Sequence, residues 1–257
     1  MPIHETIRTR GVPVHVFTDE IEAKAKQQLI DLAESGIVIG FVAAMPDVHF
    51  GMGATVGSVF ASDHAVCPNA VGVDIGCGMA ALPVPGLARG GFHPGQLDAI
   101  HRLIKERVPT GMEIHAQPKD APILHDEARS GWLSKQITAR TARQLGTLGG
   151  GNHFIEVLHD EDDGVWIMLH SGSRHIGKVT AERYNELAKE QMKARGVKAP
   201  NADLNHLLID SDDGRNYLAD MTWCQRYAAA NRHAMLEAVS GVLAEVTGRG
   251  PDWDRAV

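Results

Sequence analysis

Apolar residues in the amino-terminal part of the chain recur at spacings that distinguish strands from helices. The alternating valines of residues 12–17 predict a short half-buried strand, and Pro13 favours a position at the edge of a sheet, because proline cannot donate to a central ladder. Apolar positions at helical spacing then predict a helix that is capped near Thr18 and ends at Gly36. The β-branched run at residues 37–44 predicts a strand buried on both faces.

Glycine-rich segments interrupt the pattern that follows. Residues 45–59 predict a loop shaped by its glycines and proline, and residues 66–84 predict a strand, a glycine turn and a second strand. A helix over residues 94–108 places its apolar residues on one face. Residues 109–131 contain several prolines and glycines with little periodicity, which predicts a long loop of the kind that is often functional.

The carboxyl-terminal half predicts further helices and one hairpin. Residues 132–144 read as a helix, and the runs 154–158 and 165–169, separated by an acidic turn, predict two strands of a hairpin. Helices over residues 178–195 and 215–246 complete the pattern.

These elements together predict an α+β protein. We expect a single mixed α and β domain over residues 1–257, in which strands bring a metal site to one cleft and helices pack outside. In the last helix, helical spacing indicates that four residues pack in the core and form no site: Met221, Cys224, Met235 and Val239.

Composition narrows the class of protein. A hydrophobic content of 44% and a charged content of 22% are ordinary for a soluble globular chain, and no apolar run approaches the ~20 residues of a membrane helix. The first residues have no apolar signal core, so we expect a cytoplasmic protein without a membrane partner. Cys67, Cys77 and Cys224 form no CxxC pair, which argues against a secreted disulfide framework. A net charge of −7 leaves only a local basic patch as a surface for nucleic acid.

The stretch VGVDIGCGM, residues 71–79, presents a carboxylate and a thiol within a glycine turn. Four side chains of metal-ligand type stand beside glycine near predicted strand ends: Asp74, Cys77, His153 and His170. By ligand chemistry alone this set favours zinc or iron over manganese, and a thiolate can also bridge two ions. The alternative is structural: a buried cysteine beside a turn aspartate, with hydrogen-bonded core histidines. The glycine-rich stretch before His153 matches neither a P-loop nor a dinucleotide fingerprint.

Other residues extend the candidate site. Asp47 and His49 either hold their loop or orient a ligand of the metal. Ser171, Ser173 and Arg174 offer hydroxyls, backbone donors and a forked cation, a combination suited to phosphate or to support of the metal ligands.

Four long motifs resemble one family, the RtcB RNA ligases, in order and spacing. They are MPDVHFGMGATVGSV at 45–59, VGVDIGCGM at 71–79, LGTLGGGNHFIEV at 145–157 and VWIMLHSGSRHIG at 165–177. The similarity runs from about residue 12 to about residue 245. It implies an RtcB-like fold and an enzyme of tRNA splicing or RNA repair that joins RNA with a 2′,3′-cyclic phosphate or 3′-phosphate end to RNA with a 5′-hydroxyl end.

The resemblance also implies cofactors and roles. Asp74 and Cys77 match ligands of two manganese ions, which the thiolate bridges; His153 completes the first site and His170 belongs to the second. The guanine nucleotide pocket for GTP is implied along five consecutive residues: Asn152, His153, Phe154, Ile155 and Glu156. Arg174 is placed for phosphate, Asp47 and His49 match motif positions, and His175 stands where a small residue is expected. Neither the physiological RNA nor an activating protein is defined by the sequence.

The family reaction, as the resemblance implies it, begins when a histidine attacks the α-phosphorus of GTP. GMP then passes to the RNA 3′-phosphate, and the 5′-hydroxyl displaces it; a cyclic end is first hydrolysed. The family continues past the last long helix into a segment with another metal-binding histidine and the histidine that accepts GMP, and no SHGAGR-like stretch occurs here. We therefore expect a chain truncated at about residue 247, with an unmatched ending and no catalytic nucleophile.

Three interpretations stay open at this point. The first is an RNA ligase polypeptide with part of its active site. The second is a metal-dependent phosphoesterase that opens a cyclic phosphate without GTP. The third is an inactive metal-binding or RNA-binding remnant, which the acidic composition disfavours because it supplies no general RNA surface.

The 257-residue chain is expected to form no covalent GMP adduct, because the accepting histidine is absent from it. Incubation with labelled GTP and Mn²⁺, followed by denaturing electrophoresis, measures this. A family member that contains the SHGAGR-like stretch serves as the positive control, and a labelled band from the 257-residue chain would show that the nucleophile is assigned wrongly.

Overall fold

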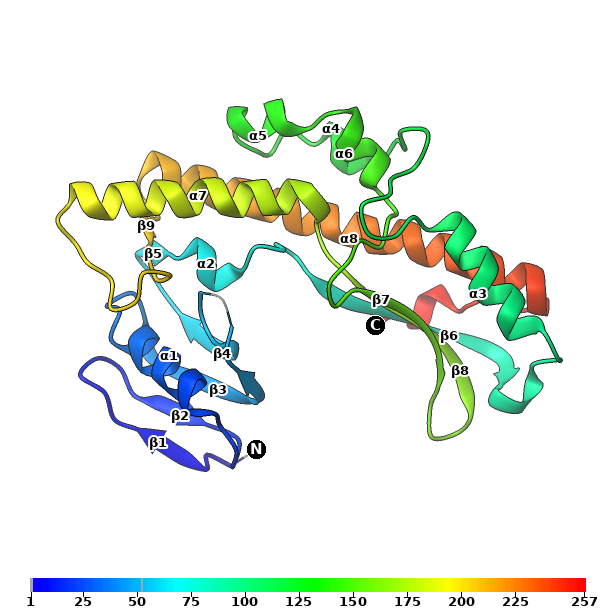
Figure 1. Cartoon of the computed structure of the whole chain (residues 1–257), viewed down its shortest axis with the longest axis horizontal. Coiled ribbons are helices and arrows are strands. Elements are labelled where there is room, and N and C mark those ends of the chain that lie inside the picture. The colour runs from blue at the N-terminus through cyan, green and yellow to red at the C-terminus, as the bar shows by residue number, and fades with distance from the viewer. Residues whose placement is uncertain (1, 52) are drawn as a thin grey trace. The chain divides into compact units, whose positions relative to one another are not determined.

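The computed structural model describes residues 2–51 and 53–257; Met52, inside the loop predicted at residues 45–59, lies outside the described residues. Its strands and helices, shown in Figure 1, confirm the α+β prediction. By compactness the chain divides into two units. The first runs to Val73 and includes Val179–Asp220, and the second comprises Asp74–Lys178 and Met221–Val257. The expectation of a single domain over the whole chain stays a prediction.

The first unit contains a four-stranded sheet in the order β1-β2-β3-β4. The strands are β1 (Glu5–Ile7), β2 (Val14–Val16), β3 (Ile39–His49) and β4 (Val56–Ala61). β2 pairs with β3 in parallel and the other neighbours pair antiparallel. Helix α1 (Ala23–Ala33) packs against β2 and β3 and supplies the helical half of this core.

The predicted helix is present, but α1 begins later than expected. Leu29 and Leu32 are fully buried, as their spacing predicted. Glu22 is the N-cap residue and makes no capping bond with its side chain, while the Thr18 hydroxyl accepts from the Glu20 N–H in the preceding turn. Burial of the apolar stripe, and not a side-chain cap, therefore decides where this helix lies.

Two predictions about the strands of this sheet were wrong. β2 is not an edge strand, because β1 pairs along it and Pro13 stands before its first residue, where only its carbonyl is used by the Val42 N–H. β3 is not buried on both faces, since α1 covers one face and leaves Ile39 and Phe41 44% and 48% exposed. The loop predicted at residues 45–59 is largely strand, because β3 continues to His49 and β4 begins soon after.

The remaining elements of the first unit are short. β5 (Ala65–Val66) pairs with β9 (Leu207–Leu208), and α2 (Pro68–Val71) stands where a strand leading to Asp74 was expected. Pro68 opens this helix, a position that proline favours because its missing N–H would be unpaired there anyway.

The second unit contains an antiparallel sheet in the order β6-β8-β7. Its strands are β6 (Gly78–Ala88), β8 (Gly164–Ser171) and β7 (Phe154–His159), so the predicted hairpin is confirmed. The 3₁₀ helix η1 (Arg89–Gly91) and helix α3 (Gln96–Arg107) follow β6. The core of this unit gathers apolar residues from the sheet and from the long last helix: Leu82, Ile167, Leu169, Met235, Val239, Val242 and Leu243.

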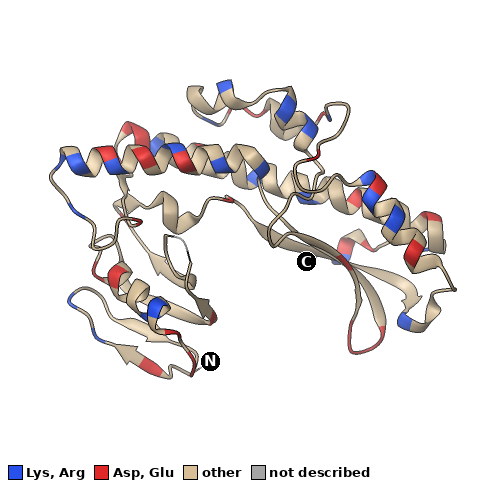
Figure 2. Ribbon diagram, viewed as in Figure 1, with Lys and Arg blue, Asp and Glu red and all other residues tan. Residues whose placement is uncertain are grey.

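The turn between β7 and β8 is acidic, as Figure 2 shows. The two carboxylate oxygens of Asp160 hold it together: Oδ1 accepts from the N–H groups of Asp162 and Gly164, and Oδ2 accepts from the Trp166 indole. An aspartate that binds the backbone of its own turn is a common turn former, so this acidic run has a structural explanation.

Short helices replace one predicted helix. In the segment 109–144 the chain forms α4 (Pro122–His125), α5 (Gly131–Gln136) and α6 (Ala139–Gln144). The helix predicted over residues 132–144 is broken because Thr138 caps α6 through a capping box with Thr141.

Two long helices take part in both units. They are α7 (Arg174–Ala194), which begins four residues before the prediction, and α8 (Asp212–Thr247). On α8, Cys224, Met235 and Val239 are fully buried, which confirms their core role, whereas Met221 is half-buried. Among the described residues, no helix is both long enough and apolar enough to cross a membrane.

The last residues of the chain pack against β6. Val257 and Ala81 exchange both backbone hydrogen bonds, and the Asp252 N–H donates to the Pro83 carbonyl. The ring of Trp253, in the 3₁₀ helix η2 (Trp253–Arg255), lies 5.0 Å from the ring of His233. The ending, which the sequence leaves unplaced, therefore contacts the edge of a sheet.

Replacement of a buried core leucine is expected to lower the free energy of unfolding far more than replacement of an exposed leucine. Leu29→Ala should lower the free energy of unfolding by about 2–5 kcal/mol through lost burial and a residual cavity. Leu97→Ala, on a helix position that is 54% exposed, is the matched control and should change it by less than about 0.5 kcal/mol. Urea unfolding followed by circular dichroism measures both, and equal losses would contradict the assigned core.

Candidate metal centre

Strand register brings three candidate ligands to one end of the second sheet. β6 and β7 both run antiparallel to β8, so both begin beside the end of β8. His170, the penultimate residue of β8, stands opposite Met79 of β6 and Phe154 of β7. Cys77 immediately precedes β6 and His153 immediately precedes β7. The pairing of the strands thus sets a thiol and two imidazoles side by side.

Asp74 joins this group through a tightly packed turn. The turn from Asp74 to Cys77 includes Gly76, at φ +75°, and a Cβ on Gly76 would stand 2.8 Å from the Cα of Gln225. A Cβ on Gly172 would stand 2.3 Å from both carboxylate oxygens of Asp74. Glycine is required at both positions because backbone and carboxylate approach too closely for a side chain.

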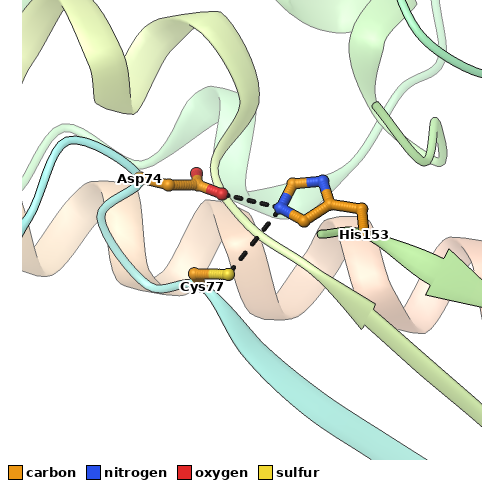
Figure 3. Close-up of side chains that lie close together, drawn as sticks. All are labelled: Asp74, Cys77 and His153. Carbon is orange, nitrogen blue, oxygen red and sulfur yellow. Dashed lines mark hydrogen bonds and ion pairs between the residues drawn. The ribbon is translucent and has the colours of Figure 1, made fainter. Parts of the chain in front are cut away.

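The donor atoms of the group are close to one another, as Figure 3 shows for three of the residues. The Nε2 atom of His153 lies 2.8 Å from Oδ2 of Asp74 and 3.7 Å from Sγ of Cys77. The Nε2 atom of His170 lies 3.0 Å from the same sulfur. In the described part of the chain, Asp74, Cys77 and His153 form a group whose donor atoms all lie within 4.8 Å of one another.

A backbone carbonyl orients each of the two imidazole rings through its Nδ1 atom. The Nδ1–H of His153 donates to the Leu148 carbonyl at 2.8 Å, and the Nδ1–H of His170 donates to the Asn152 carbonyl at 3.1 Å. With Nδ1 bound to a carbonyl, each ring directs Nε2 at the thiol. This is the arrangement found behind metal-ligating histidines, where an outer partner fixes the tautomer and the ring plane.

The group concentrates negative charge around His153. Its hydrogen bond to the Asp74 carboxylate, followed by that to Cys77, raises the pKa of His153 to about 10. Burial would raise the pKa of Asp74, but the hydrogen bond and charge of His153, with further hydrogen bonds, outweigh burial and lower it. A cation is thus favoured at this position, as proton or as metal ion.

These residues fit a divalent transition-metal ion. One carboxylate, one thiol and two imidazoles suit such ions by type. Ligands of one tetrahedral ion lie about 3.3–3.8 Å apart, from bond lengths of ~2.0–2.3 Å. The His153–Cys77 separation of 3.7 Å falls in that range, and the His153–Asp74 separation of 2.8 Å is shorter, a hydrogen-bond length. Asp74, Cys77 and His153 therefore form one donor group, which His170 joins through its contact with Cys77, and their binding of a metal stays a prediction.

Arg174 lies beside the group in a conformation that few non-glycine residues adopt, with φ +60°. Its Nε donates to the Thr147 hydroxyl and its Nη2 donates to the Gly111 carbonyl, both at 3.2 Å. Its guanidinium occupies the space where a Cβ on Gly149 would lie, 1.8 Å from Nη1. Burial lowers the pKa of Arg174, and the charge of Asp74 acts in the opposite direction.

The two serines of the SGSR stretch are fully buried. The Ser173 N–H and hydroxyl both donate to Oδ1 of Asp74, at 3.1 and 3.4 Å. The Ser171 hydroxyl donates to the Leu148 carbonyl, which also accepts from His153. Of the two roles left open by the sequence, this geometry favours support of the metal ligands over contact with a phosphate.

The residues implied for a nucleotide lie along the start of β7. Asn152 and Glu156 are exposed, whereas Phe154 and Ile155 are half-buried. The ring of Phe154 lies 5.6 Å from the ring of His170, so it packs against a candidate ligand. Nucleotide binding by these residues stays a prediction.

Asp47 and His49 belong to the first unit, where both are exposed on β3. The Nδ1–H of His49 donates to the Asp47 carbonyl, and the Asp47 carboxylate lies against Gly57. Both residues line an open pocket together with residues 18–22. These contacts give them a local structural role, and their part in the metal centre stays a prediction. His175 is exposed on the first turn of α7.

Sequence reasoning missed two adjacent residues of α8, Asn231 and Arg232, which hydrogen-bond to the segments that carry the candidate ligands. The sequence offered no signal that distinguishes this pair from other adjacent polar residues of the helix, such as Gln225 and Arg226. A buried asparagine is costly unless its amide is fully paired, so it indicates a specific local network.

Comparison with known proteins agrees with the motifs. A family model described as tRNA-splicing ligase RtcB matches residues 28–127 and 123–256. The RNA-splicing ligase RtcB of Escherichia coli strain K12 is 37% identical over 262 residues, which cover 95% of this chain and 64% of that protein. The RNA-splicing ligase RtcB of Mycobacterium tuberculosis is 28% identical, over 86% of this chain and 62% of that protein. The tRNA-splicing ligase RtcB of Methanococcus maripaludis is 27% identical, over 86% of this chain and 57% of that protein.

The fold and the site define an α+β protein with a transition-metal donor set at the end of an antiparallel sheet. The chain belongs to the RtcB family. It spans less than two thirds of the length of the relatives described above. The family match reaches residue 256, so the expectation that similarity stops near residue 245 and that the ending matches nothing was wrong.

Cys77 is expected to bind Co²⁺, used as a spectroscopic probe, through its sulfur. The Co²⁺-loaded chain should show a thiolate-to-cobalt charge-transfer band, and Cys77→Ser should abolish that band because an alcohol oxygen replaces the soft ligand. Cys67→Ser is the matched control, since burial raises the pKa of that thiol to about 11 and Cys67 lies in the first unit. Near-ultraviolet absorption during cobalt titration measures this, and a band that survives in Cys77→Ser would refute the assignment.

Proposed function

We propose that this chain provides the metal centre of an RNA ligase that joins 2′,3′-cyclic phosphate or 3′-phosphate RNA ends to 5′-hydroxyl RNA ends. The observation that carries the proposal is the group of donor atoms at the end of β8, where two imidazole Nε2 atoms contact one thiol and one of them also contacts a carboxylate. Membership of the RtcB family supports RNA as the substrate class.

Manganese and GTP are proposed as cofactors. The sulfur of Cys77 lies between His153 and His170, a position from which a thiolate can be shared by two ions. Asp74 and His153 would hold the first ion with Cys77, and His170 would hold the second. When bound, such ions neutralise charge on phosphoryl oxygens during displacement.

The chain's own residues would position the reacting groups. Arg174 is fixed by Thr147 and Gly111, and its forked cation suits a phosphate. The exposed amide of Asn152 and carboxylate of Glu156 would contact the guanine nucleotide. The cytoplasmic location expected from the sequence stays a prediction.

A local basic segment supports contact with RNA in spite of the net negative charge. Residues 128–144 contain Arg129, Lys135, Arg140 and Arg143 and no acidic residue, and Figure 2 shows lysine and arginine along α5 and α6. Lys135 and Arg140 are exposed. Cations gathered in this way attract a phosphate backbone without reading its sequence.

A metal-dependent cyclic phosphoesterase is the second candidate. Its supporting observation is that Arg174 directly follows Ser173, whose N–H and hydroxyl donate to the Asp74 carboxylate, so a cation suited to phosphate stands next to the donor group. Hydrolysis of a cyclic phosphate needs a metal-activated water and a cation for the phosphate, and it needs no nucleotide.

The decisive experiment supplies RNA whose 3′-phosphate is already joined to GMP, so that no histidine nucleophile is needed. With Mn²⁺ and a 5′-hydroxyl RNA, the 5′ oxygen should bond to the 3′ phosphorus, its proton should pass to solvent, and GMP should leave. Denaturing electrophoresis of labelled RNA measures sealing. Asp74→Asn should slow sealing at least about 100-fold, because metal stabilisation of a phosphoryl transition state is worth several kcal/mol.

The other arms separate the alternatives. RNA with a cyclic phosphate is incubated with Mn²⁺ alone, and release of a 3′-phosphate end would favour the phosphoesterase. Glu113→Gln, a substitution of an exposed carboxylate in the loop before α4, is the matched control and should seal like the native chain. Failure to seal the activated RNA, with Mn²⁺ bound, would refute the ligase.

A further inference from the structure

Two neighbouring residues of α8 hydrogen-bond to every segment that carries a candidate metal ligand. These residues are Asn231 and Arg232, and neither is itself a metal ligand here. The amide oxygen and nitrogen of Asn231 are both already hydrogen-bonded, and the side chain of Arg232 is a cation. The segments lie at residues 74–77, 146–153 and 170–173. These are the turn of Asp74 and Cys77, the glycine-rich stretch before His153, and the end of β8.

Asn231 joins the second and third of these segments. It is fully buried, and its Oδ1 accepts from the N–H groups of Gly146 and Thr147 at 2.7 and 3.1 Å. Its Nδ2 donates to the Thr147 carbonyl, the Ser171 hydroxyl and the Gly172 carbonyl at 3.2–3.3 Å. Both ends of the amide thus have hydrogen-bond partners. The oxygen binds N–H groups of the glycine-rich stretch, and the nitrogen binds oxygen atoms of that stretch and of the end of β8.

Arg232 joins the first and third segments. Its Nη1 donates to the Gly76 carbonyl at 2.7 Å and to the Ser171 carbonyl at 3.0 Å. Gly76 stands immediately before Cys77, and Ser171 stands immediately after His170. One nitrogen therefore fixes the distance between the backbones of the two residues whose Sγ and Nε2 atoms are 3.0 Å apart.

The helix that presents this pair is firmly held. Trp223, Tyr227, Met235 and Val239 are fully buried on α8, so rotation of the helix would expose large side chains. The Asp74 turn lies directly on the same helix, because Gly76 has no room for a Cβ against Gln225. Backbone contact and hydrogen bonds therefore tie the ligand-bearing turn to one rigid surface.

We propose that Asn231 and Arg232 are positioning residues that set the separation of Asp74, Cys77, His153 and His170, and thereby the affinity and coordination geometry of the bound metal. This inference rests on the proposed metal centre. The physical reason is that a change of a few tenths of an ångström in the donor positions moves metal–ligand distances outside their narrow range. Loss of Asn231 also leaves buried N–H groups at Gly146 and Thr147 without their acceptor, so the loop must move to repair them.

Asn231→Asp and Arg232→Met separate the two contributions. Asn231→Asp keeps the acceptor for Gly146 and Thr147 but removes the amide donor to the end of β8. Arg232→Met keeps much of the length of the side chain and removes both bonds that its guanidinium makes. Asn216→Asp and Arg226→Met are the matched controls, because both positions are exposed on the same helix.

Each full-length variant is titrated with Mn²⁺ while electron paramagnetic resonance measures the free ion, and the d–d absorption of the Co²⁺-loaded protein reports coordination geometry. Asn231→Asp and Arg232→Met should weaken Mn²⁺ binding by about 10–100-fold, the usual range for residues behind the ligands. The d–d bands should also shift at saturating Co²⁺. The two controls should leave both measurements unchanged.

A purely structural role would give a different result. Lower melting temperatures with native Mn²⁺ affinity and native d–d bands would overturn the inference while leaving the metal centre intact. If Asn231→Asp does not fold, Arg232→Met decides, because this residue is only partly buried. Absence of Mn²⁺ and Co²⁺ binding by the native chain would instead overturn the proposed metal centre.

Discussion

The antiparallel register of β8 with both of its neighbours is the constraint on which the candidate site depends. Because β6 and β7 pair with the same strand, their first residues must lie beside its last ones. A shift of either strand by one residue would turn its side chains to the opposite face and separate the thiol from an imidazole. The hydrophobic core beneath this sheet, shared with α8, holds that register.

The site is completed by close packing that only glycine allows. Gly172 admits the Asp74 carboxylate, Gly76 lets its turn lie on α8, and Gly149 makes room for the guanidinium of Arg174. At each position a methyl group would collide with a neighbouring atom, which belongs to the site for Gly172 and Gly149 and to α8 for Gly76. The glycine-rich motifs thus serve to shorten distances between segments, and the buried hydrogen bonds of α8 then fix those distances.

Residue type and local pattern predicted the α+β class, the hairpin, the long helices and the grouping of Asp74, Cys77, His153 and His170. The failures came where partners distant in sequence decide the outcome. β1 pairs with β2, which was predicted to be an edge strand because of Pro13. Thr138 caps α6 and so divides the helix that was predicted over residues 132–144. Asn231 was missed because its importance lies in which loops it meets, and helical spacing contains no information about them.

Unequal exposure of the candidate ligands has a consequence for exchange of the metal. Cys77 is exposed and the Asp74 side chain is 32% exposed, whereas the His153 side chain is only 5% exposed. Cys77 and Asp74 would therefore hold a metal ion on its solvent side, and His153 would hold it from the buried side. Solvent and chelators would therefore reach a bound metal from the side of Cys77 and Asp74.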